Sequence, residues 1–171
     1  MDSDGASGMI VINPNSSSTQ PPDYDEDRQV FLKDWWHTTS DQQVVGLMSN
    51  PFKFVGSPDA LLVNGKAIWF QCLPGGAYFN NSDYCLSTCT NYTSSLDTIN
   101  VTMGKTYRLR MINAAALVVM NVAITNHNIT IIEVDGTIVD PIPLVEWSGS
   151  EIVRLGSWVR FPPRGPVRPY W

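Results

Sequence analysis

The sequence predicts an all-β fold built around an antiparallel β-sandwich, and three observations support this. Residues 106–113 alternate apolar side chains with arginines, which is typical of a strand with one buried face and one exposed face. Residues 128–136 are again rich in β-branched side chains, whereas the segment between these two is too interrupted by Asn and His for a long surface helix. The pair Asn64-Gly65 is the strongest short hairpin signal in the chain.

Composition narrows the possible classes of protein. A chain of 171 residues has room for one domain with some flanking material, and a hydrophobic content of 43% is enough for a packed core. The formal charge of −5 provides no basic surface for nucleic acid or anionic lipid. The sequence has no apolar run of about 18 residues, so no segment is predicted to span a bilayer.

The first third of the chain combines short hydrophobic segments with a polar linker. Residues 9–12 form a hydrophobic stretch that is expected to be a strand and needs a sheet to join. Residues 15–27 are polar, acidic and contain Pro, as a linker does, and the acidic run at its end is expected to be solvated. Residues 28–36 predict a strand, and residues 38–48 predict a short helix capped by Thr or Ser.

Two hairpins and a long loop are expected next. Residues 58–63 and 67–72 are predicted to be the strands on either side of the Asn-Gly turn. Residues 73–95 read as a loop because they are rich in Gly, Asn, Ser and Thr. Residues 96–103 and 105–113 are predicted to form the second hairpin, around a central glycine.

Three cysteines and five glycosylation motifs point to an oxidising compartment. Cys72, Cys85 and Cys89 lie within 18 residues, where a disulfide would leave one thiol without a partner in this chain. A zinc site is the alternative, but it needs a fourth ligand and no His lies nearby. The N-terminus has neither the basic nor the apolar region of a signal peptide. The Asn-x-Ser/Thr acceptors are Asn15, Asn80, Asn91, Asn100 and Asn128.

Several segments of the chain carry a resemblance to a known family. They are Phe-Leu-Lys-Asp-Trp-Trp-His (31–37) and residues 43–47, 51–59, 61–65, 104–114 and 126–136. Together they resemble the middle plastocyanin-like (cupredoxin) domain of the multicopper oxidases, in the branch of the ascorbate oxidases and laccases. Residues 28–146 are similar to that domain, so the resemblance implies a cupredoxin-like Greek-key β-sandwich or barrel. Residues 1–14 resemble the final strand of the first cupredoxin domain, with 15–27 as the linker.

The resemblance implies a function for the parent enzyme rather than for this chain alone. Such enzymes oxidise small reductants, ascorbate or phenols, and reduce dioxygen to water with four coppers held by His-x-His and Cys-His motifs in their first and third domains. Here His37 and His127 stand apart, outside any such pair, and a structural role is expected for each. The chain alone is therefore expected to bind no copper and to be inactive, with the flanking cupredoxin domains as its partners. The parent is expected to be secreted.

The candidate substrate residues are Asp34, Trp35 and Trp36. The resemblance implies an acidic residue near the phenol site of laccases and a tryptophan beside the ascorbate pocket. An indole face can stack on a flat reduced ring, and a carboxylate can accept a phenol proton as the electron leaves. The simpler interpretation is that one tryptophan of such a pair belongs to the core. The resemblance also implies a disulfide between Cys72 and Cys85, with Cys89 bonding to another domain.

Other interpretations stay open at this point. The start within a strand, the odd cysteine and a divergent tail at 147–171 suggest a fragment or truncated gene product, with a tail that is frameshifted or disordered. A stand-alone, non-catalytic cupredoxin module that acts in binding or assembly is the alternative function. A ferroxidase-type parent is a further option, which the Trp-Trp pair disfavours.

Overall fold

The computed structural model describes residues 4–13, 15, 17, 19–79, 81–83, 85, 96–124, 127, 129–144 and 152–154. In this part of the chain the fold is all-β and consistent with the cupredoxin-like class predicted from the sequence, with one short α-helix and one 3₁₀ turn. The elements are β1 (Glu26–Trp35), α1 (Ser40–Leu47), β2 (Ala60–Val63), η1 (Phe70–Cys72), β3 (Tyr107–Asn113), β4 (Asn121–Ala123), β5 (Ile129–Val134), β6 (Thr137–Leu144) and β7 (Ile152–Arg154).

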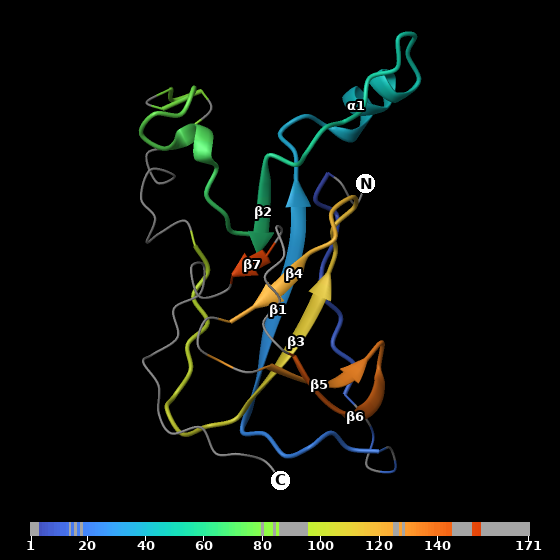
Figure 1. Cartoon of the computed structure of the whole chain (residues 1–171), viewed down its shortest axis with the longest axis vertical. Coiled ribbons are helices and arrows are strands. Elements are labelled where there is room, and N and C mark those ends of the chain that lie inside the picture. The colour runs from blue at the N-terminus through green and yellow to red at the C-terminus, as the bar shows by residue number, and fades with distance from the viewer. Residues whose placement is uncertain are drawn as a thin grey trace. The chain divides into compact units, whose positions relative to one another are not determined.

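The strands form three small sheets. The largest has the order β2-β1-β3, so β1 lies at its centre (Figure 1). β1 and β2 are antiparallel, with Leu32 opposite Val63 and Trp35 opposite Ala60. β5 and β6 form an antiparallel hairpin, while β4 pairs with β7 in parallel. Part of the tail beyond residue 147 therefore contributes a strand.

The chain divides into two compact units, and β1 and β3 each contribute residues to both. The first unit comprises residues 1–9, 30–97 and 111–119, and the second comprises the remainder. Alternation along β1 buries Val30 and Leu32, which lie at the core of the first unit with Val63, Ile68 and Leu73. These buried side chains hold β1 in place within the first unit.

The Asn64-Gly65 turn is confirmed, but the hairpin that it closes is short. Both residues have positive φ (50° and 77°), as a type I′ turn requires. The only bridge across it, among the described residues, joins Val63 to Lys66. The predicted strand at 67–72 is wrong: η1 occupies its end, because the chain turns there toward a disulfide at Cys72.

The second predicted hairpin is also wrong in its first strand. Residues 96–103 contain no strand, and β3 instead lies beside β1. A genuine hairpin forms later, where Asp135 and Gly136 have φ of 48° and 76° between β5 and β6. Residues 9–12, expected to be a strand, are assigned to no sheet in the described part of the chain, and Ile10 and Ile12 are more than 80% exposed.

Near the start of β3, the arginine predicted to be exposed is buried, and the apolar side predicted to be buried is partly exposed. Arg108 is buried, with its side chain 7% exposed, while Tyr107 is only half-buried. The guanidinium of Arg108 donates to the carboxylate of Glu133 and also lies near Asp27, so its charge is compensated. The alternation of apolar residues with arginines identified the strand but not which face is inside.

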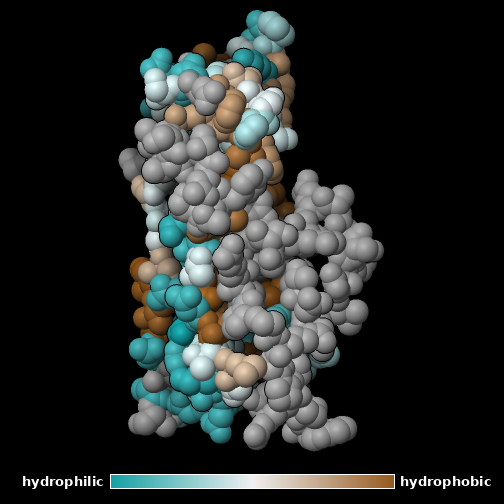
Figure 2. Space-filling model, turned by 90° about the vertical axis from the view of Figure 1, so that its left-hand side faces the viewer, coloured by the Kyte–Doolittle hydropathy of each residue, from teal (hydrophilic) through white to brown (hydrophobic). Residues whose placement is uncertain are grey.

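α1 confirms the predicted short helix, although its packing is unusual. None of its residues is buried, and it presents large apolar side chains to solvent. Figure 2 shows that hydrophobic residues reach the surface among hydrophilic ones on one face of the molecule. In the described residues no helix is both long and apolar enough to cross a bilayer. The exposed apolar side chains of α1 and the segment after it are Val44, Val45, Leu47, Met48, Phe52 and Phe54.

Candidate functional site

The candidate site lies at the C-terminal end of β1, where Asp34, Trp35, Trp36 and His37 follow one another. All four belong to the first compact unit. Pairing with β2 fixes the strand as far as Trp35, because Asp34 lies opposite Leu61 and Trp35 opposite Ala60. Neighbouring side chains on a strand point to opposite faces, so these residues have different surroundings.

Asp34 is fully buried and its carboxylate is saturated with hydrogen bonds. The main-chain amide of Ala116 donates to Oδ1 at 2.9 Å, and those of Leu117 and Val118 donate to Oδ2 at 2.9 and 3.2 Å. A buried carboxylate is costly unless such donors compensate it. Asp34 therefore anchors the loop at 114–118 to β1, and its carboxylate has no exposed surface from which to take a proton from a reductant.

Trp36 is a core residue with one unusual feature. Its side chain is 9% exposed, and its Nε1–H has no hydrogen-bond acceptor among the described residues. A buried indole normally finds an acceptor for this group. The burial supports the simpler of the two interpretations, in which one tryptophan of the pair belongs to the core.

Trp35 is the half-buried member of the pair. Its carbonyl oxygen accepts a hydrogen bond from the amide of Asp59 at 2.8 Å, which extends the β1–β2 pairing by one residue. Gly5 lies against its indole, since a Cβ built on Gly5 would be 3.3 Å from Cζ3 of Trp35. Of the three candidate substrate residues, only Trp35 keeps an appreciable exposed surface.

His37, for which a structural role is predicted, is held by neighbouring side chains. Oδ2 of Asp59 accepts from the backbone amide of His37 at 2.8 Å and lies 3.0 Å from its ring Nδ1. The imidazole stacks on Trp69 at a centroid distance of 3.9 Å, and Trp69 stacks in turn on Tyr78 at 5.3 Å. Asp59 and Trp69 thus hold the end of β1. Sequence reasoning assigned a role to neither, because their contacts with His37 join residues far apart in the chain.

The residues present do not fit a copper site. In the described part of the chain no three His, Cys, Asp or Glu side chains lie close enough together to hold a metal ion. Copper sites in proteins are built from several imidazole ligands, to which blue-copper sites add a thiolate. His37 has Asp59 at one ring nitrogen, and His127 is exposed, with its amide donating to the carbonyl of Ile124.

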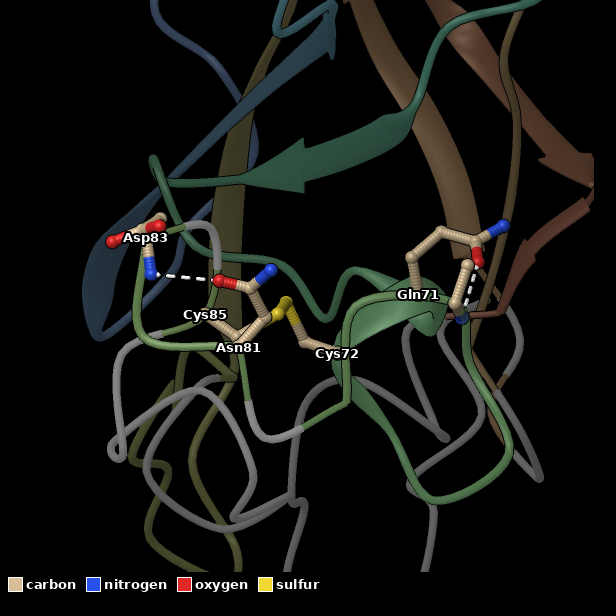
Figure 3. The surroundings of a disulfide bond; sticks show 6 residues. Gln71, Cys72, Asn81, Asp83 and Cys85 are labelled. Atoms are coloured by element: carbon tan, nitrogen blue, oxygen red, sulfur yellow. Dashed lines mark hydrogen bonds between the residues drawn. A yellow bond between two sulfur atoms is a disulfide. The ribbon is translucent and has the colours of Figure 1, made fainter.

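A disulfide joins Cys72 to Cys85, with the Cα atoms 5.6 Å apart. This is the pairing that the resemblance implied, and Cys89 lies outside the described residues. Figure 3 shows the bond between η1 and the following loop, where the amide of Asp83 donates to Asn81 and that of Ala77 donates to Gln71. The two cysteines are buried, so the bond belongs to the core of this loop.

Two of the five glycosylation acceptors lie in the described part of the chain. Asn15 and Asn100 are both exposed. Oδ1 of Asn15 accepts hydrogen bonds from the amide and the hydroxyl of Ser17, the third residue of its motif, at 3.0 and 2.7 Å. Asn80, Asn91 and Asn128 lie outside the described residues.

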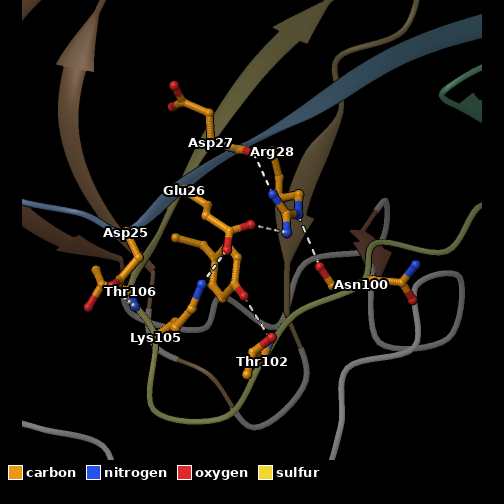
Figure 4. Close-up of polar contacts among 9 residues, drawn as sticks. Asp25, Glu26, Asp27, Arg28, Asn100, Thr102, Lys105 and Thr106 are labelled. Atoms are coloured by element: carbon orange, nitrogen blue, oxygen red, sulfur yellow. Dashed lines mark hydrogen bonds and ion pairs between the residues drawn. The ribbon is translucent and has the colours of Figure 1, made fainter.

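A second polar cluster ties the start of β1 to the segment before β3, within the second unit (Figure 4). The Glu26 carboxylate accepts from Lys105 and, at 2.6 Å, from Arg28. These two hydrogen bonds, the one from Lys105 being the stronger cause, lower the pKa of Glu26. Asp25 accepts from the amide of Thr106 at 2.6 Å. The acidic run expected to be a solvated linker is thus paired, and β1 begins within it at Glu26.

Comparison with known proteins gives a consistent result. Residues 26–148 match the family model described as multicopper oxidase. The chain is 34% identical to an L-ascorbate oxidase of Cucurbita pepo var. melopepo over 141 residues, which cover 80% of this chain and 24% of the relative. It is 36% identical to Laccase-2 of Thanatephorus cucumeris over 141 residues, covering 81% of this chain and 21% of that relative.

The similarity extends into the tail in one comparison. An L-ascorbate oxidase of Nicotiana tabacum is 29% identical over 175 aligned residues, which cover 98% of this chain and 28% of the relative. The chain therefore spans about a quarter of the length of the curated relatives that it matches.

Proposed function

Because this chain belongs to the multicopper oxidase family, we propose that it is part of an enzyme that oxidises ascorbate or phenols and reduces dioxygen to water. It contributes the middle plastocyanin-like domain, between two further cupredoxin domains that hold the copper. Copper supplies the one-electron chemistry there when bound. The names of the relatives, L-ascorbate oxidase and laccase, support this choice of reaction.

Trp35 is the residue of this chain that we propose to contact the reductant. Its indole is half-buried at the end of β1, whereas Trp36 is in the core and Asp34 is saturated by main-chain donors. A fixed indole face offers a flat reductant a stacking surface at little cost in conformational entropy. Asp34 acts indirectly, by anchoring β1 and the loop at 114–118. The half-exposed indole in an otherwise buried stretch carries this proposal.

The flanking domains are the proposed partners. Exposed Val45, Met48 and Phe52 in and after α1 form an apolar surface of the kind that normally marks a protein interface. The two exposed glycosylation acceptors and the disulfide support a secreted parent, because disulfides persist in oxidising compartments.

The test is the complete coding sequence that contains this chain, expressed in a eukaryotic secretory host. We expect a secreted blue protein that consumes dioxygen with ascorbate or hydroquinone. Trp35→Ala should raise KM for the reductant by roughly fivefold to tenfold, the loss of one aromatic contact of about 1–1.4 kcal/mol. Phe70→Ala, which removes a 65% exposed aromatic ring, is the control and should leave KM unchanged. A complete protein without copper or oxidase activity would refute the proposal.

A further inference from the structure

The N-terminal segment Asp4–Ser7 contacts the end of β1 at two places and the start of α1 at a third, and we call it the strap. All of its partners belong to the same compact unit. Ser7 Oγ accepts a hydrogen bond at 2.6 Å from Nζ of the buried Lys33, which precedes Trp35 in β1. Asp4 accepts a hydrogen bond from Ser40, which follows Trp35 in the sequence. Gly5 lies between these two attachments, against the Trp35 indole.

The attachment at Asp4 is a helix cap supplied from a distant part of the chain. Its Oδ1 accepts from the amide of Ser40 at 2.8 Å, and its other oxygen accepts from the Ser40 hydroxyl. The N-cap residue of α1 itself, Thr39, makes no side-chain capping bond. A carboxylate at a helix N-terminus satisfies free N–H groups and complements the helix dipole. The strap is therefore fixed at one end to the first turn of α1.

The middle of the strap, at position 5, favours glycine. Its φ is +98°, a conformation that side-chain-bearing residues rarely adopt. A Cβ at this position would lie 3.3 Å from Cζ3 of Trp35, so the ring would have to shift by a few tenths of an ångström to accept it. The Ser7 amide donates to the Gly5 carbonyl at 2.9 Å, which tightens the turn over the ring.

We propose that the strap positions the Trp35 indole, and that Gly5 sets the ring plane offered to the reductant. The inference rests on the function proposed above, in which Trp35 is the residue that meets the reductant. Gly5 and Asp4 are positioning residues here, since they act through Trp35.

The experiment follows the six indole N–H signals of the ¹⁵N-labelled chain by NMR, with Trp35 assigned from Trp35→Phe. Gly5→Ala should displace the Trp35 signal by more than its line width and leave the other indoles in place. Gly8→Ala is the matched control, because a Cβ there meets nothing within 4 Å, and the Trp35 signal should not move. Equal signals in Gly5→Ala and wild type, or an equal displacement in Gly8→Ala, would overturn the proposal.

Two further variants keep the test decisive if Gly5→Ala does not fold. Asp4→Asn and Ser7→Ala each weaken one attachment of the strap, so both should move the Trp35 signal in the same direction by a smaller amount. A Trp35 signal that has the same position in both variants as in the wild type would contradict the proposal that the strap positions the indole.

Hydroquinone oxidation by the complete protein separates this inference from the function on which it rests. KM for hydroquinone should rise roughly twofold to tenfold in Gly5→Ala, because the ring no longer occupies its preferred rotamer. A Trp35 signal that moves in Gly5→Ala of this chain, with an unchanged KM in Trp35→Ala of the complete protein, refutes the reductant contact and leaves the positioning intact. An unchanged KM in Gly5→Ala, with a raised KM in Trp35→Ala, refutes the role of the strap in binding.

Discussion

At the scale of single residues, Asp34 is the group on which the site most depends. Its carboxylate is buried without exposed surface, and three main-chain amides from one loop donate to it. Hydrogen bonds to a charged acceptor are roughly twice as strong as neutral ones. Removal of the carboxylate would leave three donors without a partner, which is why the residue type at this position is narrowly constrained.

Asp34→Ala should therefore lower the free energy of unfolding by about 3 kcal/mol or more, because buried donors left unsatisfied lose hydration without compensation. Asp34→Asn, which keeps an acceptor oxygen, should cost less. Urea unfolding followed by tryptophan fluorescence measures both. Asp83→Ala, at an exposed aspartate, is the control and should stay within about 0.5 kcal/mol of wild type. A similar loss in the two alanine variants would contradict the anchoring role.

Asp4 provides a pH-dependent contact. Its pKa is lowered, chiefly by the hydrogen bond from the Ser40 hydroxyl and then by that from the Ser40 amide. A folded-state pKa below the unfolded value stabilises the fold above the unfolded pKa of about 3.9, and this contribution disappears as the pH falls through the folded pKa.

The Ser40 amide signal should accordingly titrate at a pH below about 3.9, and this transition should be absent in Asp4→Asn. An NMR titration from pH 7 to pH 2 measures it. A Ser40 signal that titrates alike in Asp4→Asn and wild type would show that another group is responsible.

At the scale of elements, α1 is the least supported part of the first unit. It has eight residues, none of them buried, and isolated helices of this length are marginal in water. β1 is central in its sheet and contains the buried Val30 and Leu32. Local opening should therefore begin at α1.

Amide exchange should show this difference directly. The amides of α1 should be protected at least roughly 100-fold less than those of Leu32 and Lys33, because local opening there costs little free energy. Dilution of the sample serves as the control, since a second copy covering α1 would make its protection depend on concentration. Equal protection in α1 and β1 at all dilutions would be incompatible with an uncovered helix.

Sequence reasoning succeeded for elements that carry their own local signal. The alternation at 106–113, the Asn64-Gly65 turn and the short helix at 40–47 were all identified in this way, and the structure contains each of them. It failed at 67–72, because the chain turns there toward the disulfide at Cys72. It also failed at 96–103, because β3 pairs with β1 and not with that segment. The burial of Asp34 and Arg108 was not foreseeable, because their partners lie 82 and 25 residues away.

At the scale of the whole molecule, the disulfide is the one covalent constraint among the described residues. It closes a loop with a sequence separation of 13 residues, next to the buried Leu73. A cross-link of this loop length stabilises a fold by about 3 kcal/mol, if the effect comes from the lower conformational entropy of the unfolded chain.

Replacement of Cys72 and Cys85 by Ala together should therefore lower the free energy of unfolding by about 2–4 kcal/mol. Guanidinium unfolding at a fixed pH measures the change. Cys89→Ser is the control, because the structure joins the other two cysteines to each other. A loss of stability in Cys89→Ser that matches the double variant would indicate a different pairing in solution.

The central place of β1 has a consequence for the order of synthesis. β1 leaves the ribosome before β3, and residues 36–106 separate these neighbouring strands. At about 5–20 residues per second, translation of that interval takes roughly 4 to 14 seconds. During this time one edge of a strand that ends at Trp35 has no neighbour, so this edge is open to pairing with another chain.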